Sequence, residues 1–234
     1  MSAPAVVMAQ KWRELLFLHW KLEPELVQAS LPPGLEVDVF DDSAWLGVVP
    51  FQMRAIRPRY LPPLPHLSYF LEANVRTYVR DRHGRPGVWF YSLDCNRRLA
   101  VATARRFFSL PYFFARMRAQ RTASGSLDYR VQRADAAAES RFVYRGAGEV
   151  RTAAPDSLEH FLAERYRLFA WQAARQRLLT GEVEHVPYSL QDALVEDHDQ
   201  RLLRAAGFEL GEQQPAHALY SAGVDVRVRR VELV

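Results

Sequence analysis

The chain has 234 residues, of which 49% are hydrophobic and 25% are charged, and its formal net charge is +4. This balance excludes a disordered chain, and the length suits one all-β domain. No apolar stretch approaches the roughly 20 residues of a membrane-spanning helix. The first ten residues lack the basic flank and apolar run of a signal peptide. We therefore expect one domain, residues 1–234, in the cytoplasm and without a membrane partner.

The basic residues are almost all arginines, because Lys11 and Lys21 are the only lysines in the sequence. They are dispersed among 27 acidic residues without a run of like charges, which argues against a nucleic-acid partner. The single cysteine, Cys95, excludes an internal disulfide. From residue 22 onward, no lysine exists to form a Schiff base with a carbonyl substrate.

The first part of the chain predicts strands and one short helix. Aromatic and apolar residues dominate 12–20, which predicts a strand, and a proline at its first turn suits a helix over 24–30. Residues 35–40 alternate apolar and acidic side chains, whereas 44–53 are largely apolar. With turn residues between them, these two segments predict a hairpin.

The middle of the chain predicts a second hairpin. A proline-rich loop over 57–66 comes first, and the hairpin strands are 70–80 and 88–96, joined by a glycine-containing turn. Residues 99–108 suit a short helix, which Pro111 limits.

The last part of the chain predicts a third hairpin, from 126–133 and 140–146. Apolar residues at helical spacing predict a helix over 157–169 that resumes through 171–179. Alternation returns in 223–233, which predicts a final strand. The whole pattern indicates a mainly β fold, a barrel or strongly curved antiparallel sheet with a few helices.

The strand around 72–78 carries the most informative polar residues. Successive side chains of a strand point to opposite faces, so Glu72, Asn74, Arg76 and Tyr78 share one face. This face is either a solvated outer surface or a polar lumen. In a lumen, the planar guanidinium of Arg76 would hold a carboxylate.

The register of the second hairpin decides which residues join this row. A turn centred on Gly84 places Asn74 opposite Asp94 and Arg76 opposite Ser92. Glu72, Arg76 and Asp94 would then form one polar cluster. A slip of one residue would move Asp94 to the other face.

Segments along most of the chain, roughly residues 12–195, resemble the YqjF-like family of uncharacterised conserved proteins. They include AWLGVVPFQM (44–53), SYFLEANVRTYV (68–79), GVWFYSLDCNRRLAVATARRFFSLPYFFARM (87–117), FLAERYRLF (161–169) and EVEHVPYSLQDA (182–193). Members of that family usually carry Trp where this chain has Tyr188. The family is grouped with the acetoacetate decarboxylase-like superfamily, and the resemblance implies a cone-like β barrel around a central cavity, with helices outside.

The resemblance also implies a changed reactive position. In the decarboxylases, a Gly-Phe-Pro-Lys-like segment supplies the Schiff-base lysine, and the similar segment here ends in Tyr112. A phenol cannot condense with a ketone, although it can donate a hydrogen bond to a carbonyl or an enolate. The alternative for Tyr112 is a packed aromatic ring with a satisfied hydroxyl. Glu72 is similar in placement to a glutamate near the decarboxylase site.

Other candidate residues carry weaker signals. Arg105 and Arg106 precede the Tyr112 segment on the predicted helix, and either one could reach the cavity. The seven histidines, His66 among them, show no metal-ligand spacing, so we predict no metal site. No glycine pattern for nucleotide phosphates occurs, and we predict no cofactor.

We therefore predict a small-molecule-binding barrel whose ligand is a small organic acid or ketone. Arg76 would bind a carboxylate and Tyr112 a carbonyl or hydroxyl. The remaining predicted binding residues are Glu72, Asn74, Tyr78, Asp94 and Arg105. If the protein is an enzyme, we expect lyase, isomerase or hydrolase chemistry with Tyr112 and Glu72 as acid and base.

The alternative is a non-catalytic binding or regulatory module. In that case Phe107, Phe108 and Phe113 would pack the cavity shut. The sequence leaves open whether the chain forms a homo-oligomer.

Overall fold

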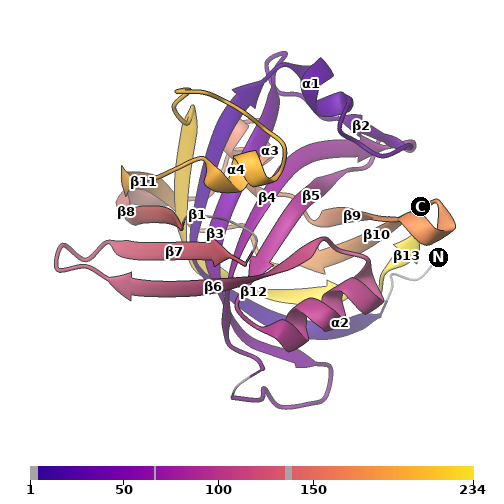
Figure 1. The fold of residues 1–234 in the computed structure, drawn as a ribbon, viewed down its shortest axis with the longest axis horizontal. Helices are drawn as coiled ribbons and strands as arrows, with labels where there is room; N and C mark the ends of the chain where they lie inside the picture. The colour runs from indigo at the N-terminus through magenta and orange to yellow at the C-terminus, as the bar shows by residue number, and fades with distance from the viewer. Residues whose placement is uncertain (1–4, 66, 135–138) are drawn as a thin grey trace.

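Strands dominate the computed structural model, which describes residues 5–65, 67–134 and 139–234. In this part of the chain they form one 13-stranded sheet (Figure 1). The strands are β1 (Val6–Leu22), β2 (Leu35–Val37), β3 (Ala44–Pro58), β4 (Phe70–Asp81), β5 (Pro86–Cys95), β6 (Tyr112–Arg121), β7 (Leu127–Arg133), β8 (Ser140–Arg151), β9 (Arg167–Gln172), β10 (Arg177–Glu184), β11 (Leu190–Asp197), β12 (His217–Arg229) and β13 (Glu232–Leu233). The helices are α1 (Pro24–Gln28), α2 (Arg98–Phe108), α3 (Leu158–Ala163) and α4 (Arg201–Ala205), with a short 3-10 turn η1 (Ala173–Arg175).

The sheet closes on itself twice and so bounds two compartments. Strands β12, β1, β3, β4 and β5 pair in that order and form a shared wall. On one side, β9 pairs with β5 and β10 pairs with β12. On the other side, β6 to β8 and β11 connect the same two strands, β5 and β12. We call the side closed by β9 and β10 the hollow compartment and the other the filled compartment.

The filled compartment holds the larger hydrophobic core. Leu16 and Leu18 of β1 and Val75 of β4 face Tyr129 and Phe142 across it, all fully buried. Burial of this much apolar surface is the main contribution to the stability of the fold. The wall therefore has one face that is packed against side chains throughout.

Bulges in the wall decide which side chains face the hollow compartment. The pairing of β1 with β3 shifts between Arg13 and Leu18, where Glu14 adopts a positive φ of 56°. Because the extra residue reverses the alternation, both Trp12 and Leu15 line the same cavity. The pairing of β1 with β3 shifts a second time near Ala55 of β3, whose φ is 50°. This shift likewise reverses which side chains of β3 face the hollow compartment.

The predicted hairpin of 35–40 with 44–53 is wrong. Strand β2 pairs with β4, and only Phe40 and Ser43 form a bridge. The pairing of β3 with β4 ends at Thr77, so the edge of β4 from Val79 to Asp81 is free to accept β2.

The predicted helix over 157–169 is too long, and its continuation over 171–179 is wrong. The serine at position 157 caps α3, since its hydroxyl accepts the backbone N–H of His160 at 3.2 Å. Helix α3 nevertheless ends at Ala163, and the chain continues as β9, η1 and β10. Pairing of β9 with β5 and β10 outweighs the helical spacing of the apolar residues.

Other predictions are confirmed. The fold is mainly β with a strongly curved, closed sheet, and the second and third hairpins form as β4–β5 and β7–β8. The predicted helix over 99–108 is α2. Two pairings, β5 with β6 and β5 with β9, are parallel, and no sequence pattern predicted β6. None of the described helices has the length and apolar character to cross a membrane.

Candidate functional site

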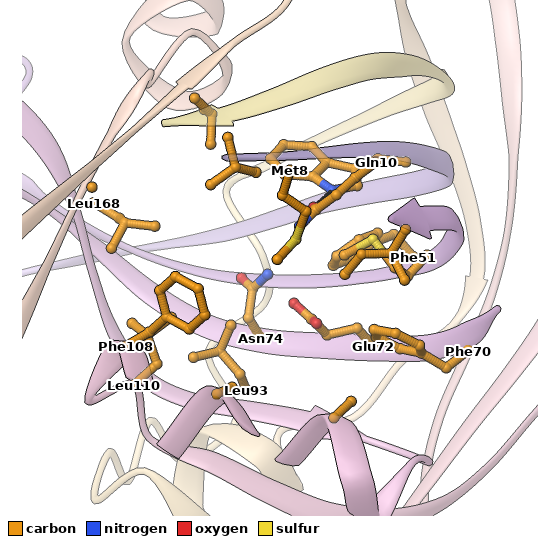
Figure 2. A pocket seen from close by; sticks show the side chains of 18 of the residues that line it. Met8, Gln10, Phe51, Phe70, Glu72, Asn74, Leu93, Phe108, Leu110 and Leu168 are labelled. Carbon is orange, nitrogen blue, oxygen red and sulfur yellow. Dashed lines mark hydrogen bonds between the residues drawn. The ribbon is translucent and has the colours of Figure 1, made fainter. Parts of the chain in front are cut away.

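A cavity of about 490 Å³ lies in the hollow compartment. Its walls are mostly apolar and come from β1, β3, β4, β5, β10 and α2. Three successive polar residues of β4, namely Glu72, Asn74 and Arg76, line it together with Tyr112 of β6. Figure 2 shows the Glu72 carboxyl and the Asn74 amide pointing into the same space.

Side chains along β4 alternate between the two compartments, and this alternation directs the polar row into the hollow one. Ala73 and Val75 belong to the core of the filled compartment, so the residues between them face the hollow one. Glu72, Asn74 and Arg76 are only 3%, 5% and 9% exposed. The row is therefore not a solvated outer surface.

Glu72 is buried and hydrogen-bonded to Tyr112. The Tyr112 hydroxyl donates to Oε2 of Glu72 at 2.8 Å. Desolvation raises the pKa of Glu72 to about 8, the Tyr112 hydrogen bond opposes the rise, and the nearby Asp94 adds to it. At neutral pH most of the Glu72 carboxyl groups are thus protonated.

Tyr112 reaches this position through a β5–α2–β6 crossover. Ser109 ends α2 in the left-handed conformation, with a φ of 53°, and Pro111 leads into β6. The parallel pairing then sets Tyr112 beside Leu93, and both side chains line the cavity. Burial and the adjoining Glu72 raise the pKa of Tyr112 well above its ordinary value.

Arg76 is a buried cation without a carboxylate partner among the described residues. Its Nη2 donates to the backbone oxygen of Leu162 at 2.9 Å, near the end of α3. Its guanidinium lies 5.4 Å from the ring centre of Phe17, and its Nε is buried without a hydrogen-bond acceptor in the described chain. Buried charges are ordinarily paired, so this group has capacity for an anion.

Two other arginines at the cavity are neutralised by the protein. Arg165 contacts Asp38 at 2.8 Å, and Arg167 forms an ion pair with Glu182. Both line the cavity, and both differ from Arg76 in having a carboxylate of the protein against the guanidinium. Arg57 also lines the cavity but is exposed, so the buried arginine of the lining without a carboxylate partner in the described chain is Arg76.

Asn74 adds a second polar group with unused hydrogen-bonding capacity. Its Oδ1 is buried and has no hydrogen-bond donor among the described residues. An amide can present either its oxygen or its NH₂ group. Asn74 can therefore donate a hydrogen bond to an anion or accept one from a hydroxyl.

Tyr78 lies behind the cavity and supports Arg76. Its hydroxyl donates to the Leu162 oxygen at 2.8 Å and contacts Nε2 of His19 at 2.7 Å. Desolvation and the Arg76 charge lower the pKa of His19 well below its ordinary value, so the imidazole is neutral. Gly47 makes room for this arrangement, since a Cβ there would lie 2.9 Å from His19.

Asp94 does not join the polar row, so that prediction is wrong. The pairing of β4 with β5 shifts between Val75 and Arg76, which leaves one extra residue on β5. Asp94 is consequently opposite Ala73 and faces the other side of the sheet, where it contacts Arg133 at 3.4 Å. A single bulge has moved the carboxylate out of the cavity.

The prediction that Arg105 or Arg106 reaches the cavity is also wrong. Both side chains are exposed, and neither lines the cavity. Nε of Arg105 donates to the backbone oxygen of Tyr112 at 2.5 Å, so it contacts the same residue from outside. The two lysines are likewise remote, since Lys11 pairs with Asp225 and Lys21 lies over Trp45.

Of the three phenylalanines expected to close the cavity, the two whose side chains the structure describes do not fill it. Phe108 lines the cavity, whereas Phe113 lies against Arg133, with 3.8 Å between guanidinium and ring centre. The side chain of Phe107 lies outside the described residues, as does His66. Within the described chain, no three His, Cys, Asp or Glu residues gather as metal ligands would.

Sequence reasoning missed several residues of the site. Tyr188 lines the cavity, edge-on to Phe17 at 5.3 Å, and its hydroxyl has no hydrogen bond to the described chain. The resemblance implies an aromatic residue at position 188, but it assigns no role to that residue. Arg165 was hidden in a predicted helix, and His19 was indistinguishable from a core histidine.

Known proteins of similar sequence match almost the whole chain. Residues 9–225 match the DUF2071 family, described as an uncharacterised conserved protein. The uncharacterised protein YqjF of Bacillus subtilis is 39% identical over 210 residues, which cover 89% of this chain and 85% of YqjF.

Solved structures of low sequence identity share the fold. Acetoacetate decarboxylase from Legionella pneumophila has a TM-score of 0.67 at 12% identity, covering 100% of this chain and 90% of that chain. An acetoacetate decarboxylase-like enzyme from Sphingomonas wittichii has a TM-score of 0.64 at 13% identity, covering 98% and 93%. The enduracididine biosynthesis enzyme MppR, complexed with pyruvate, has a TM-score of 0.61 at 14% identity, covering 100% and 91%. The chain therefore belongs to the DUF2071 family of uncharacterised conserved proteins, and it has the acetoacetate decarboxylase-like fold.

Proposed function

We propose that the hollow compartment binds a small organic acid or ketone, and that Arg76 holds the carboxylate of the acid. The observation that carries the proposal is the buried Arg76 side chain, which lines the cavity, has no carboxylate partner in the described chain and has an Nε without an acceptor there. Its unused capacity lies beside Asn74, whose amide can donate a further hydrogen bond. A carboxylate there would pair the charge and satisfy both groups.

The pair of Glu72 and Tyr112 is proposed to act on the carbonyl or hydroxyl of the ligand. A pKa of about 8 lets Glu72 exchange protons near neutral pH, which suits a general acid or base. In the ionised form, Glu72 would take a proton from the carbon beside a ketone. The Tyr112 O–H would then donate to the resulting enolate oxygen. This is the proton transfer with which lyase and isomerase reactions of keto acids begin.

We further propose that Tyr112 occupies the position of the Schiff-base lysine of acetoacetate decarboxylases. Two observations support this assignment. Tyr112 lines the cavity beside Glu72, and both lysines of the chain lie elsewhere. The ligand would therefore be held without a covalent bond to an amine. The pyruvate complex of MppR, a protein of the same fold, lends weight to a keto acid as the ligand class.

A thermal-shift screen of keto acids and lactones tests the proposal. A ligand that binds the native state raises the midpoint of unfolding by mass action. We expect keto acids to stabilise the protein, Arg76→Ala to remove that shift, and the control Arg116→Ala, at an exposed position of β6 outside the cavity lining, to retain it. If Arg76→Ala keeps the full shift for an acid, Arg76 is not the anchor.

A non-catalytic binding module remains the second candidate, and the same cavity would serve it. The two candidates differ in proton exchange. In deuterated buffer, an enzyme of the proposed type exchanges the protons beside the carbonyl of its ligand. Tyr112→Phe and Glu72→Gln would abolish this exchange. If a ligand binds but no exchange exceeds the rate in buffer, the module is the correct alternative.

A further inference from the structure

The cavity is much larger than its polar groups require. An apolar protein cavity of about 150 Å³ accommodates benzene. By that scale, the 490 Å³ cavity has room for a ligand of roughly fifteen to twenty non-hydrogen atoms. A keto acid of the size of pyruvate would leave most of this volume unfilled, and unfilled apolar volume forfeits contact energy.

The space beyond the polar row is lined by large apolar side chains. The row ends at Glu72, and the next residue of β4 that faces the cavity is Phe70. Trp12 of β1 and Phe51 and Met53 of β3 continue the wall. Figure 2 shows Phe51 and Phe70 on the Glu72 side of the cavity. Along β4, the lining thus changes from charged at Arg76 to apolar at Phe70.

Beyond Phe70, in the direction from Arg76 to Phe70 along β4, the cavity ends at a rim of apolar side chains. Phe70 begins β4 directly after the loop that joins β3 to β4, and Leu61, Leu64 and Leu67 of this loop line the cavity. Leu99 of α2 lines it as well. All four leucines are also exposed, between 40% and 57%. Exposed apolar residues that gather at the edge of a cavity mark a ligand-binding groove.

We infer that the ligand is an amphiphilic acid, with its carboxylate on Arg76 and an apolar chain that extends past Phe51, Phe70 and Met53 to the leucine rim. The inference rests on the proposed function, because it uses the same anchor, and it adds the class of ligand. With the two carboxylate oxygens subtracted, a chain of roughly thirteen to eighteen carbons matches the available volume. The chain would bury the apolar lining that a short acid leaves open to water.

Isothermal titration calorimetry of the full chain with straight-chain carboxylates tests this inference. The probes are butanoate, hexanoate, octanoate, decanoate and dodecanoate at pH 7, below their micelle concentrations. Burial of each methylene predicts an affinity that rises roughly three- to fourfold per carbon through the whole series, because even dodecanoate is shorter than the longest acid that the cavity can hold. Arg76→Ala should weaken every acid in the series.

Two matched leucine variants separate the rim from general surface effects. Leu99 and Leu26 are 57% and 55% exposed, and Leu26 lies on α1, away from the cavity. Leu99→Asp should lower the ratio of dodecanoate to butanoate affinity by about tenfold, because it places a charge beside the apolar chain. Leu26→Asp should leave this ratio unchanged.

The outcomes distinguish the inference from the proposed function. If butanoate binds through Arg76 and affinity does not increase with chain length, the amphiphile is excluded and the proposed function stands. If no carboxylate or keto acid binds, both are wrong. If Leu26→Asp lowers the ratio as much as Leu99→Asp does, the long acids bind to the general surface, and the inference fails.

Discussion

The two compartments of this protein share a wall but use their polar groups differently. In the filled compartment, the Tyr129 hydroxyl donates to the backbone oxygens of Phe51 and Glu72, at 2.7 and 2.8 Å. The Tyr144 hydroxyl donates to the backbone oxygen of Glu14, at the bulge of β1. In the hollow compartment, by contrast, the Tyr112 hydroxyl meets the side chain of Glu72, and Arg76 has an unused donor.

The difference shows where stability comes from and where binding capacity is kept. Tyrosines of the filled side satisfy carbonyl groups of the wall and so fix the strands that carry the polar row. Buried polar groups without partners, such as those of Asn74 and Arg76, weaken a folded protein. We interpret them as groups reserved for a ligand, held in place by the packed compartment behind them.

The largest expected effect comes from a cavity made in the filled compartment. Phe142 is fully buried there, so Phe142→Ala should lower the free energy of unfolding by about 3–5 kcal/mol. Phe108 is half-buried at the edge of the hollow compartment, and Phe108→Ala should cost about 1 kcal/mol or less. Urea unfolding of both variants measures the contrast, and equal losses would contradict the distinction between the compartments.

Glu72 should make stability depend on pH in the opposite direction to an ordinary paired carboxylate. Its pKa is about 8 in the folded chain and 4.5 without the fold, so the folded state binds more protons between these values. Stability therefore falls as pH rises from about 4.5 to 8, by the order of a few kcal/mol, and levels off above 8. Glu72→Gln should remove this slope in urea unfolding at a series of pH values. An unchanged slope would show that Glu72 is not the buried acid.

A pair of tyrosine variants should separate the two roles of a phenol. Tyr129→Phe leaves two buried carbonyl oxygens without the hydroxyl that donates to them. We expect the free energy of unfolding to fall by about 1–3 kcal/mol and ligand binding to be retained at temperatures where the variant is folded. Tyr112→Phe should change stability by less and abolish exchange at the ligand. Chemical unfolding and the exchange measurement would contradict the account if the two variants behaved alike.

The smallest effect is expected at Gly47, between β1 and β4. An added Cβ would meet His19 at 2.9 Å and Cγ of Arg76 at 3.6 Å, so the neighbours must move. We expect Gly47→Ala to cost about 1–2 kcal/mol and to weaken binding of acids by displacing Arg76. Gly84→Ala is not a suitable control, because its φ of +71° would add backbone strain. Unchanged binding of acids by Gly47→Ala would contradict the dependence of the Arg76 position on the space at residue 47.

The sequence predicts the polar row but not every partner of it. The alternation of side chains between the two faces over 72–78 depends only on the geometry of one strand, and it is present in the structure. The place of Asp94 depends on a bulge in β5, for which the residues carry no local signal. A prediction from turn position alone therefore placed Asp94 in the wrong compartment.

Elements defined by long-range pairing were the other source of error. Residues 167–172 have apolar side chains that fit a helix as well as a strand, and their contacts with β5 and β10 decide for β9. Strand β2 pairs with β4 because the pairing of β3 with β4 stops at Thr77, which no local pattern reveals. By contrast, hairpins with strong alternation and glycine-containing turns, such as β4–β5, could be predicted.

The most direct test of the account observes the Arg76 guanidinium during ligand binding. The Nε–H groups of arginine give separate signals in ¹H–¹⁵N NMR spectra, and Arg76→Lys would assign the one of interest. On addition of a carboxylate, we predict a shift of the Arg76 signal, as its Nε–H gains an acceptor, and little change for Arg165, whose Nε already donates to the Phe161 oxygen at 2.7 Å. A carboxylate that binds while the Arg76 signal stays unchanged would contradict the account.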